Sequence, residues 1–161
     1  MEEFVSTFTN RLDSKGRVSV PASFRQVLAR DGFEGLYCCP TLDQNAVDAG
    51  GNRLLQQIRA SLARFEPFSE DHEYLSTTLI GESEILKIDG DGRVSLTESI
   101  KSYAGIADAV TFVGQGYKFQ IWEPERFDAY RSEARNRLRD LRKRLVPGSR
   151  ASAEAAPGGS E

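Results

Sequence analysis

The fold is predicted from the stretch LDSKGRVSVP, residues Leu12–Pro21, because this stretch occurs twice. Residues Ile88–Thr97 read IDGDGRVSLT, so an Asp, a Gly, an Arg, a Val and a Ser recur at a constant offset of 76 residues. The elements predicted after each copy also recur in order: a short helix, a strand, a turn, a strand and a longer helix. The sequence therefore predicts two copies of one unit of about 70 residues. Because neither copy alone offers much core, we expect both to pack into one pseudo-symmetric body.

Both copies carry the pattern Asp-x-x-Gly-Arg, which is typical of a tight turn between β-strands. We expect Asp13 and Asp89 to accept hydrogen bonds from N–H groups of the turn. Gly16 and Gly92 are expected to supply the left-handed backbone that such a turn needs. The Arg after each Gly can return to pair with the Asp. Since alternating apolar and polar residues flank each turn, the pattern predicts a β-hairpin in each copy.

Basic side chains gather at the first of these turns. Lys15 and Arg17 belong to it, and Arg11 stands just before it. A two-stranded ribbon fits the major groove of DNA, and Arg pairs bidentately with guanine or binds phosphate. From the residues alone two interpretations stay open: a turn that contacts DNA, or a basic hairpin without a nucleic-acid partner.

The remaining pattern of short strands and helices indicates an α+β fold. Helices are expected at 23–28, 52–65 (with Asn52 as N-cap), 69–80, 99–103 and 124–145, and strands at 4–12, 17–20, 35–39, 84–89, 93–96, 109–113 and 118–122. The expected organisation is repeat one at 1–51, linking helices at 52–81, repeat two at 82–124, a basic amphipathic helix at 125–146 and a disordered tail at 147–161.

The last helix holds most of the charge asymmetry of the chain. The 161 residues carry a formal net charge of −3, yet residues 126–150 contain nine Lys or Arg and only three acids. Such a segment either meets a polyanion, docks on an acidic protein surface, or is a solvated amphipathic helix. Apolar residues follow the helix at spacings of three and four: Phe127, Tyr130, Ala134, Leu138, Leu141 and Leu145. We expect this stripe to pack either on the body of the protein or against a neighbouring subunit, and we favour the subunit interface because the last leucines lie beyond the repeat.

Residues that carry catalysis or bind metals are scarce. Cys38 and Cys39 are adjacent, so on a strand they point to opposite faces and are expected to be core or surface filler. His72 is the single histidine and falls in a polar helix. The carboxylate pair Asp89 and Asp91 lies in a turn without a His, Cys or metal cluster, and no Gly-rich phosphate loop precedes a helix. We therefore expect no enzyme activity, no metal, no cofactor and no small-molecule substrate.

The chain also carries no sign of a membrane segment. It begins with the acidic stretch Met1–Phe4, and no run approaches the roughly 18 apolar residues that span a bilayer. Neither a secretory signal nor a membrane partner is expected, which predicts a cytoplasmic protein.

The two repeated units resemble the AbrB-like swapped-hairpin DNA-binding module, and their tandem arrangement resembles the MraZ family of bacterial transcriptional regulators. Val113–Gly116 and Phe119–Trp122 resemble the end of that family's second repeat. The likeness covers about residues 1–145. One departure is Gln44–Asp48, which is polar where the family usually has an apolar strand.

The resemblance implies two pseudo-symmetric swapped-hairpin modules and a homo-oligomer that forms a closed ring. It also implies binding to short direct repeats in double-stranded promoter DNA, and regulation, usually repression, of the division and cell-wall gene cluster from its own promoter, in the cytoplasm and nucleoid. Lys15 and Arg17 stand at the positions of the family's DNA-facing basic residues, Arg93 is the matching arginine of repeat two, and Arg11 lies close by. Asp91 replaces Lys15 in repeat two, so repeat one is expected to lead the contact.

A second interpretation is an antitoxin-like AbrB protein that binds DNA and holds a toxin through its C-terminal region. The basic helix Arg126–Arg144 would be the segment it uses. Antitoxins of this type usually carry one copy of the motif and a disordered tail, whereas this chain has two copies and a predicted helix.

Overall fold

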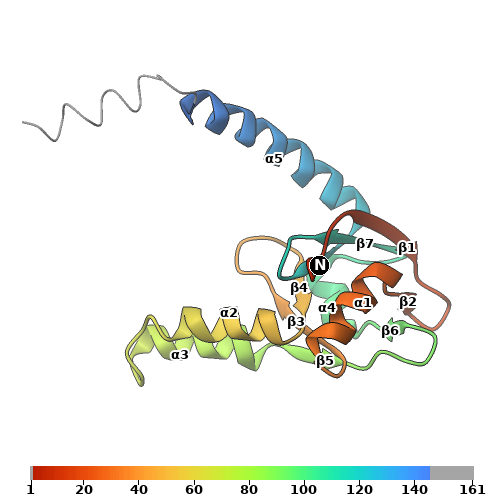
Figure 1. Cartoon of the computed structure of the whole chain (residues 1–161), viewed down its shortest axis with the longest axis horizontal. Helices are drawn as coiled ribbons and strands as arrows, with labels where there is room; N and C mark the ends of the chain where they lie inside the picture. Colours follow the sequence, from red (N-terminus) through yellow and green to blue (C-terminus); the bar gives the residue numbers. More distant parts are fainter. Residues whose placement is uncertain (1, 146–161) are drawn as a thin grey trace, which may run out of the picture. The chain divides into compact units, whose positions relative to one another are not determined.

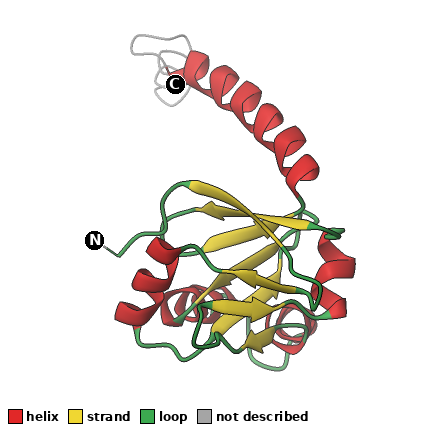
Figure 2. Ribbon diagram, turned by 90° about the vertical axis from the view of Figure 1, so that its right-hand side faces the viewer, coloured by secondary structure: helices red, strands yellow, loops and turns green. Residues whose placement is uncertain are grey.

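The computed structural model describes residues 2–145, and the chain divides after Pro124 into two units. Antiparallel strands and helices make up the first unit, which confirms the predicted α+β class, and helices flank its strands on both sides (Figure 2). Its elements are β1 (Thr7–Arg11), β2 (Arg17–Ser19), α1 (Ala22–Asp31), β3 (Leu36–Pro40), β4 (Val47–Gly50), α2 (Asn52–Leu62), α3 (Glu70–Ser76), the π-helical turn η1 (Thr77–Gly81), β5 (Glu84–Leu86), β6 (Arg93–Ser95), α4 (Glu98–Ala104), β7 (Ala109–Gly114) and β8 (Phe119–Trp122). The second unit contains α5 (Pro124–Leu145).

A six-stranded antiparallel sheet lies at the centre of the first unit. Its strand order is β1-β7-β8-β4-β3-β5. In the order of the repeat, β1 corresponds to β5, β3 to β7 and β4 to β8. Exchanging each strand for its counterpart reverses the order of the sheet and leaves it otherwise unchanged. At the middle of the sheet Asp48 pairs with Gln120, and these two residues occupy the same position in β4 and β8. This register is the one that two equivalent halves related by an approximate two-fold axis produce.

The pairing of the strands corrects the expectation of a local hairpin at each repeated turn. Among the described residues β1 pairs with β7 and β2 pairs with β6, so the strands on the two sides of the first turn lie in different sheets. The turn itself is still closed, because the backbone N–H of Asp13 donates to the carbonyl of Arg17 at 2.8 Å. In the two-stranded sheet Val18 pairs with Val94, and both are buried. The strands on both sides of the first turn thus pair with strands of the other copy, whereas β3 pairs with β4 and β7 with β8 within one copy.

Aromatic side chains of both copies form the centre of the core. Phe24 of α1 is fully buried, and its ring centroid lies 4.8 Å from that of Phe119 in β8. Phe4 contacts both, with centroids 5.3 Å from Phe24 and 5.0 Å from Phe119. Each copy therefore buries apolar surface against the other, so the stability of one copy depends on the presence of the other.

Cys38 and Cys39 lie on opposite faces of the sheet, as predicted for neighbours on a strand. Cys38 belongs to the main core, whereas Cys39 packs with Leu54 and Ile58 of α2 on the other face. Burial raises the pKa of both thiols, so both are kept as neutral, apolar groups. Of the two roles expected for these cysteines, core or surface filler, the structure shows the first for both.

β4 forms although it overlaps the polar stretch Gln44–Asp48, and its one carboxylate, that of Asp48, is paired. The Oδ1 atom of Asp48 accepts hydrogen bonds from Nζ of Lys118 at 2.7 Å and from Nε2 of Gln120 at 2.9 Å. Because a paired carboxylate is tolerated where an unpaired one is not, the polar sequence does not prevent the strand.

The carboxylate of Asp31 caps α2. Its Oδ2 accepts from the backbone N–H of Asn52 at 2.6 Å, and its Oδ1 accepts from that of Arg53 at 3.3 Å. The expectation that Asn52 caps the helix is wrong, because the helix begins at Asn52 and its side chain donates to the carbonyl of Asp31. Since Asp31 is the last residue of α1, the cap also joins α1 to α2.

Replacing Asp31 by Ala should lower the free energy of unfolding by about 1 kcal/mol, because it leaves N–H groups of the first turn of α2 without an acceptor. Urea denaturation at neutral pH measures this loss. Asp43→Ala is the matched control, since Asp43 is an exposed carboxylate in a turn, and it should change the stability by less than about 0.5 kcal/mol. Equal losses in both variants would show that Asp31 does not act as a cap.

Helices α2 and α3 lie side by side and form an arm that projects from the sheet (Figure 1). The Oγ atom of Ser69 accepts from the backbone N–H of His72 at 3.2 Å, which makes Ser69 the N-cap of α3 and confirms the predicted start of this helix. His72 is half-buried on α3.

The predicted last helix is confirmed as α5, and within residues 2–145 no helix is both long and apolar enough to cross a lipid bilayer. The predicted disordered tail at 147–161 lies outside the described residues.

Candidate nucleic-acid interface

One carboxylate holds the first repeated turn in shape. The Oδ1 atom of Asp13 accepts from the backbone N–H groups of Lys15 and Arg17, both at 2.9 Å, and its Oδ2 accepts from Nε of Arg17 at 2.8 Å. Gly16 has φ 79°, in the left-handed region that favours glycine. The turn therefore exposes the side chain of Lys15 and holds Arg17, which is 31% exposed, beside it.

The second turn has the same backbone bonds. The Oδ1 atom of Asp89 accepts from the backbone N–H of Asp91 at 2.8 Å and from that of Arg93 at 3.0 Å, and Gly92 has φ 80°. The two turns thus share one geometry and differ in the side chains that they present.

Carboxylates surround the arginine of the second turn. Its Nη2 lies 3.2 Å from Asp91, its Nε 3.4 Å from Asp89, and its Nη1 3.8 Å from Asp13 of the first turn. Arg93 therefore links the two turns, and three acids offset its charge. By contrast, no ion pair within residues 2–145 involves Lys15.

The two turns consequently differ in charge. The charged residues of 11–17 sum to +2, whereas those of 87–93 sum to zero. Because DNA attracts positive charge that is not already neutralised, the residues of the first turn are the better candidates for contact with phosphate.

Two further cations lie against the turns and were missed by the sequence analysis. A Cβ atom placed on Gly16 would lie 3.6 Å from Nζ of Lys101, and one placed on Gly92 would lie 2.6 Å from Nε of Arg25. Arg25 and Lys101 are themselves separated by the repeat offset of 76, which is the signal that could have found them. Lys101 and Arg11 both line a groove of about 330 Å³ beside the first turn, but Asp13 and Asp108 line it too, and Nζ of Lys101 lies 3.0 Å from Glu98. The groove therefore adds no net positive charge to the turn.

Comparison with known proteins places this arrangement in a family. The family model described as "MraZ protein, putative antitoxin-like" matches residues 79–147. The chain is 65% identical to the transcriptional regulator MraZ of Beijerinckia indica subsp. indica over 145 residues, which cover 90% of this chain and 88% of that relative. The chain belongs to the MraZ family. Two other relatives with the same name come from Methylocella silvestris (60% identical; 90% and 88% covered) and Azorhizobium caulinodans (56% identical; 92% and 95% covered).

The MraZ relatives are named as transcriptional regulators, a class of proteins that are not enzymes. The family and the non-enzymatic class predicted from the sequence are thereby confirmed.

Acid should destabilise this MraZ-family protein through its two turn carboxylates. Hydrogen bonds, first of all from the backbone N–H of Arg17, lower the pKa of Asp13 below its usual 3.8, and the backbone N–H of Arg93 does the same for the pKa of Asp89. The unfolded chain therefore binds these protons more readily. Their stabilising effect is present above about pH 4 and is lost as the pH falls through the folded-state pKa values.

We expect the midpoint of urea unfolding to fall from about pH 4 downward. The variant Asp13→Asn/Asp89→Asn should lose less stability over the same range, because its turns no longer contain the two titrating groups. Parallel profiles for the two proteins would contradict this assignment.

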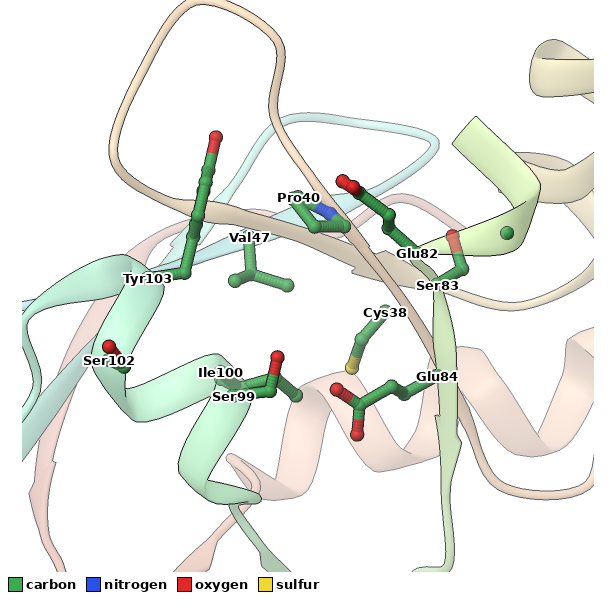
Figure 3. Close-up of a pocket in the computed structure, with 11 residues that line it drawn as sticks. Cys38, Pro40, Val47, Glu82, Ser83, Glu84, Ser99, Ile100, Ser102 and Tyr103 are labelled. Atoms are coloured by element: carbon green, nitrogen blue, oxygen red, sulfur yellow. The ribbon is translucent and has the colours of Figure 1, made fainter. Parts of the chain in front are cut away.

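A larger cavity of about 570 Å³ lies elsewhere in the first unit (Figure 3). Glu82 and Glu84 lie on one side of it, Ser99 and Tyr103 of α4 on the other, and Cys38 at its floor. None of the predicted DNA-facing residues lines it, so it is separate from the cationic site. Within residues 2–145 no group of three or more His, Cys, Asp or Glu side chains could hold a metal ion.

Proposed function

We propose that this MraZ-family protein regulates transcription by binding double-stranded DNA through the first repeated turn. The observation that carries the proposal is the difference between two turns of the same geometry. The first exposes Lys15, which forms no ion pair within residues 2–145, and the second surrounds Arg93 with acids. Lys15 supplies a point charge for phosphate. The ion pair of Arg17 with Asp13 uses Nε, so the terminal nitrogens of Arg17 are donors for a guanine edge or a phosphate.

The other cations have supporting positions in this proposal. Arg11 is an exposed cation just before the first turn and supplies a further charge for phosphate, in a groove that Asp13 and Asp108 also line. Arg93, the fourth predicted DNA-facing residue, contributes less because its charge is offset. We extend the proposal to the organisation of the chain, with AbrB-like modules at 1–51 and 82–124 joined by the arm at 52–81.

A single turn with three cations is a weak binder, because affinity for DNA grows with the number of phosphates that are neutralised. Self-association into a ring supplies the missing affinity, since several turns then meet several copies of a short sequence at a high effective concentration. Direct repeats in DNA are the natural target of such an assembly. The acidic remainder of the chain repels DNA away from the turns, which favours specific over bulk binding.

The proposed targets follow from the family resemblance. They are direct repeats in the promoter of the protein's own gene and of the division and cell-wall gene cluster, where binding represses transcription at the nucleoid.

An electrophoretic mobility shift with the DNA upstream of the protein's own gene, run at two salt concentrations, tests the proposal. We expect a specific complex whose affinity falls steeply at the higher salt. A control fragment in which the repeats are scrambled should bind at least tenfold more weakly. Equal binding to both fragments, or binding that does not respond to salt, would refute the proposal.

A further inference from the structure

The outer end of the α2–α3 arm is acidic and has no neutralising partner in the described chain. Residues 65–74 contain four carboxylates and no Lys or Arg, and within residues 2–145 none of the four forms an ion pair. The four are Glu66, Glu70, Asp71 and Glu73, and all are exposed. Carboxylates in the first turn of a helix interact favourably with the helix dipole, which accounts for those in α3. The dipole does not account for the apolar side chains among them.

The same end of the arm exposes two aromatic rings. Phe68 is 92% exposed and Tyr74 is 64% exposed. Phe68 also has φ 70°, which is unfavourable for a residue with a bulky side chain. It directly precedes the N-cap Ser69, where an apolar residue normally packs against the fourth residue of the helix, but that residue is Glu73. Because Phe68 is strained and exposed and does not pack within this arm, we take this end of the arm as a candidate contact surface.

The outer half of α5 has the complementary chemistry. Residues 135–145 contain six Lys or Arg and one acid. Leu138, Leu141 and Leu145 follow one face of this half at spacings of three and four, and they are 54%, 39% and 67% exposed. The positive charge fits a polyanion or an acidic protein surface. Three exposed leucines between the charges favour the protein surface, because phosphate offers them no apolar contact.

We propose that the outer end of the α2–α3 arm of one copy binds the outer half of α5 of a second copy. Carboxylates of the arm then face arginines of the helix, while Phe68 and Tyr74 pack against the three leucines. Two different surfaces meet in this contact, so it is a head-to-tail interface, which closes into a ring when the rotation permits. The inference rests on the self-association in the proposed function and names the surfaces that produce it.

Charge reversal on each surface tests the contact. One variant carries Glu66→Lys/Glu73→Lys in the arm, and the other carries Arg139→Glu/Arg142→Glu in α5. Sedimentation velocity of the full-length protein should show that each variant associates at least tenfold more weakly than the wild type. A chain with both pairs of substitutions should recover the oligomer, and so should an equimolar mixture of the two variants. The matched control, Glu34→Lys/Asp43→Lys, reverses two exposed acids outside both surfaces and should leave the oligomer unchanged.

The apolar part of the contact has its own test in Phe68→Gly. Glycine adopts positive φ without strain, so this variant should be at least as stable as the wild type in urea and should nevertheless associate more weakly. Leu42→Ser removes another exposed apolar side chain, 56% exposed, and should not affect association.

Several outcomes would overturn the inference. A monomeric wild type would remove the interface, although single turns could still bind DNA. An oligomer that none of these variants weakens would place the interface elsewhere and leave the proposed DNA binding unaffected. If the α5 variant loses affinity for DNA while its oligomer keeps the mass of the wild-type oligomer, the basic helix binds nucleic acid. If the variants of both surfaces lose association, and neither the equimolar mixture nor the combined variant regains it, the two surfaces do not bind each other.

Discussion

Arg17→Ala should weaken the binding of the protein to promoter repeats by about tenfold or more for each turn that engages DNA. A good arginine contact to a base or phosphate contributes about 1–3 kcal/mol, and 1.4 kcal/mol corresponds to a factor of ten. Because the turns of one oligomer act together, a complex that engages two turns should lose about 100-fold. The slope of log affinity against log salt should also decrease, by about 0.9 for each phosphate contact that is lost.

A second variant must distinguish the loss of a DNA contact from a change in the shape of the turn, because Nε of Arg17 also donates to Asp13 at 2.8 Å. Lys15→Ala removes a side chain without an ion pair and should lower both affinity and salt slope while the turn keeps its bonds. Arg30→Ala, an exposed cation near the end of α1, is the control and should change neither. Fluorescence anisotropy with labelled repeat DNA gives both quantities. Wild-type affinity and slope in Arg17→Ala and Lys15→Ala would show that the first turn does not contact DNA.

Phe24→Ala should reduce the free energy of unfolding by about 3–5 kcal/mol, a large part of the stability of a domain of this size. The ring is fully buried and lies edge-on to Phe4 and Phe8, with a further contact to Phe119 of the second copy. Removing it creates a cavity where the two copies meet.

Urea denaturation followed by the fluorescence of the single tryptophan, Trp122, measures this loss. Leu42→Ala is the control, since truncating an apolar side chain at a 56% exposed position outside the proposed interface should alter the stability by less than about 1 kcal/mol. A loss below about 1 kcal/mol for Phe24→Ala would mean that the two copies do not share a core.

Local sequence predicted most of the elements and could not predict how they pair. The start of α3 near Ser69 and the turn between β7 and β8 depend on neighbours in the chain, and both are found where expected. The pairing of β1 with β7 joins residues about 100 apart, and an apparent hairpin sequence contains no information about that partner. The cap of α2 failed for the same reason, because Asp31 reaches Asn52 across 21 residues.

Likewise, some features of the candidate site could be predicted from local sequence and others could not. Its carboxylate and glycine positions follow from turn chemistry, which is local. The contact of Arg93 with Asp13, and the approach of Arg25 and Lys101 to the turns, arise only when the two copies come together. The offset of 76 residues between the two copies relates such positions to each other. Applying this offset to every charged residue would have identified Arg25 and Lys101.

Exchange of one charge between the two turns tests the central claim most directly. Lys15→Asp gives the first turn the charge of the second, and Asp91→Lys does the reverse, with the backbone geometry of both turns retained. Salt-dependent binding to promoter repeats should show that Lys15→Asp loses affinity and salt slope, and that Asp91→Lys gains both. A Lys15→Asp protein that binds these repeats with the affinity and slope of the wild type would contradict the account.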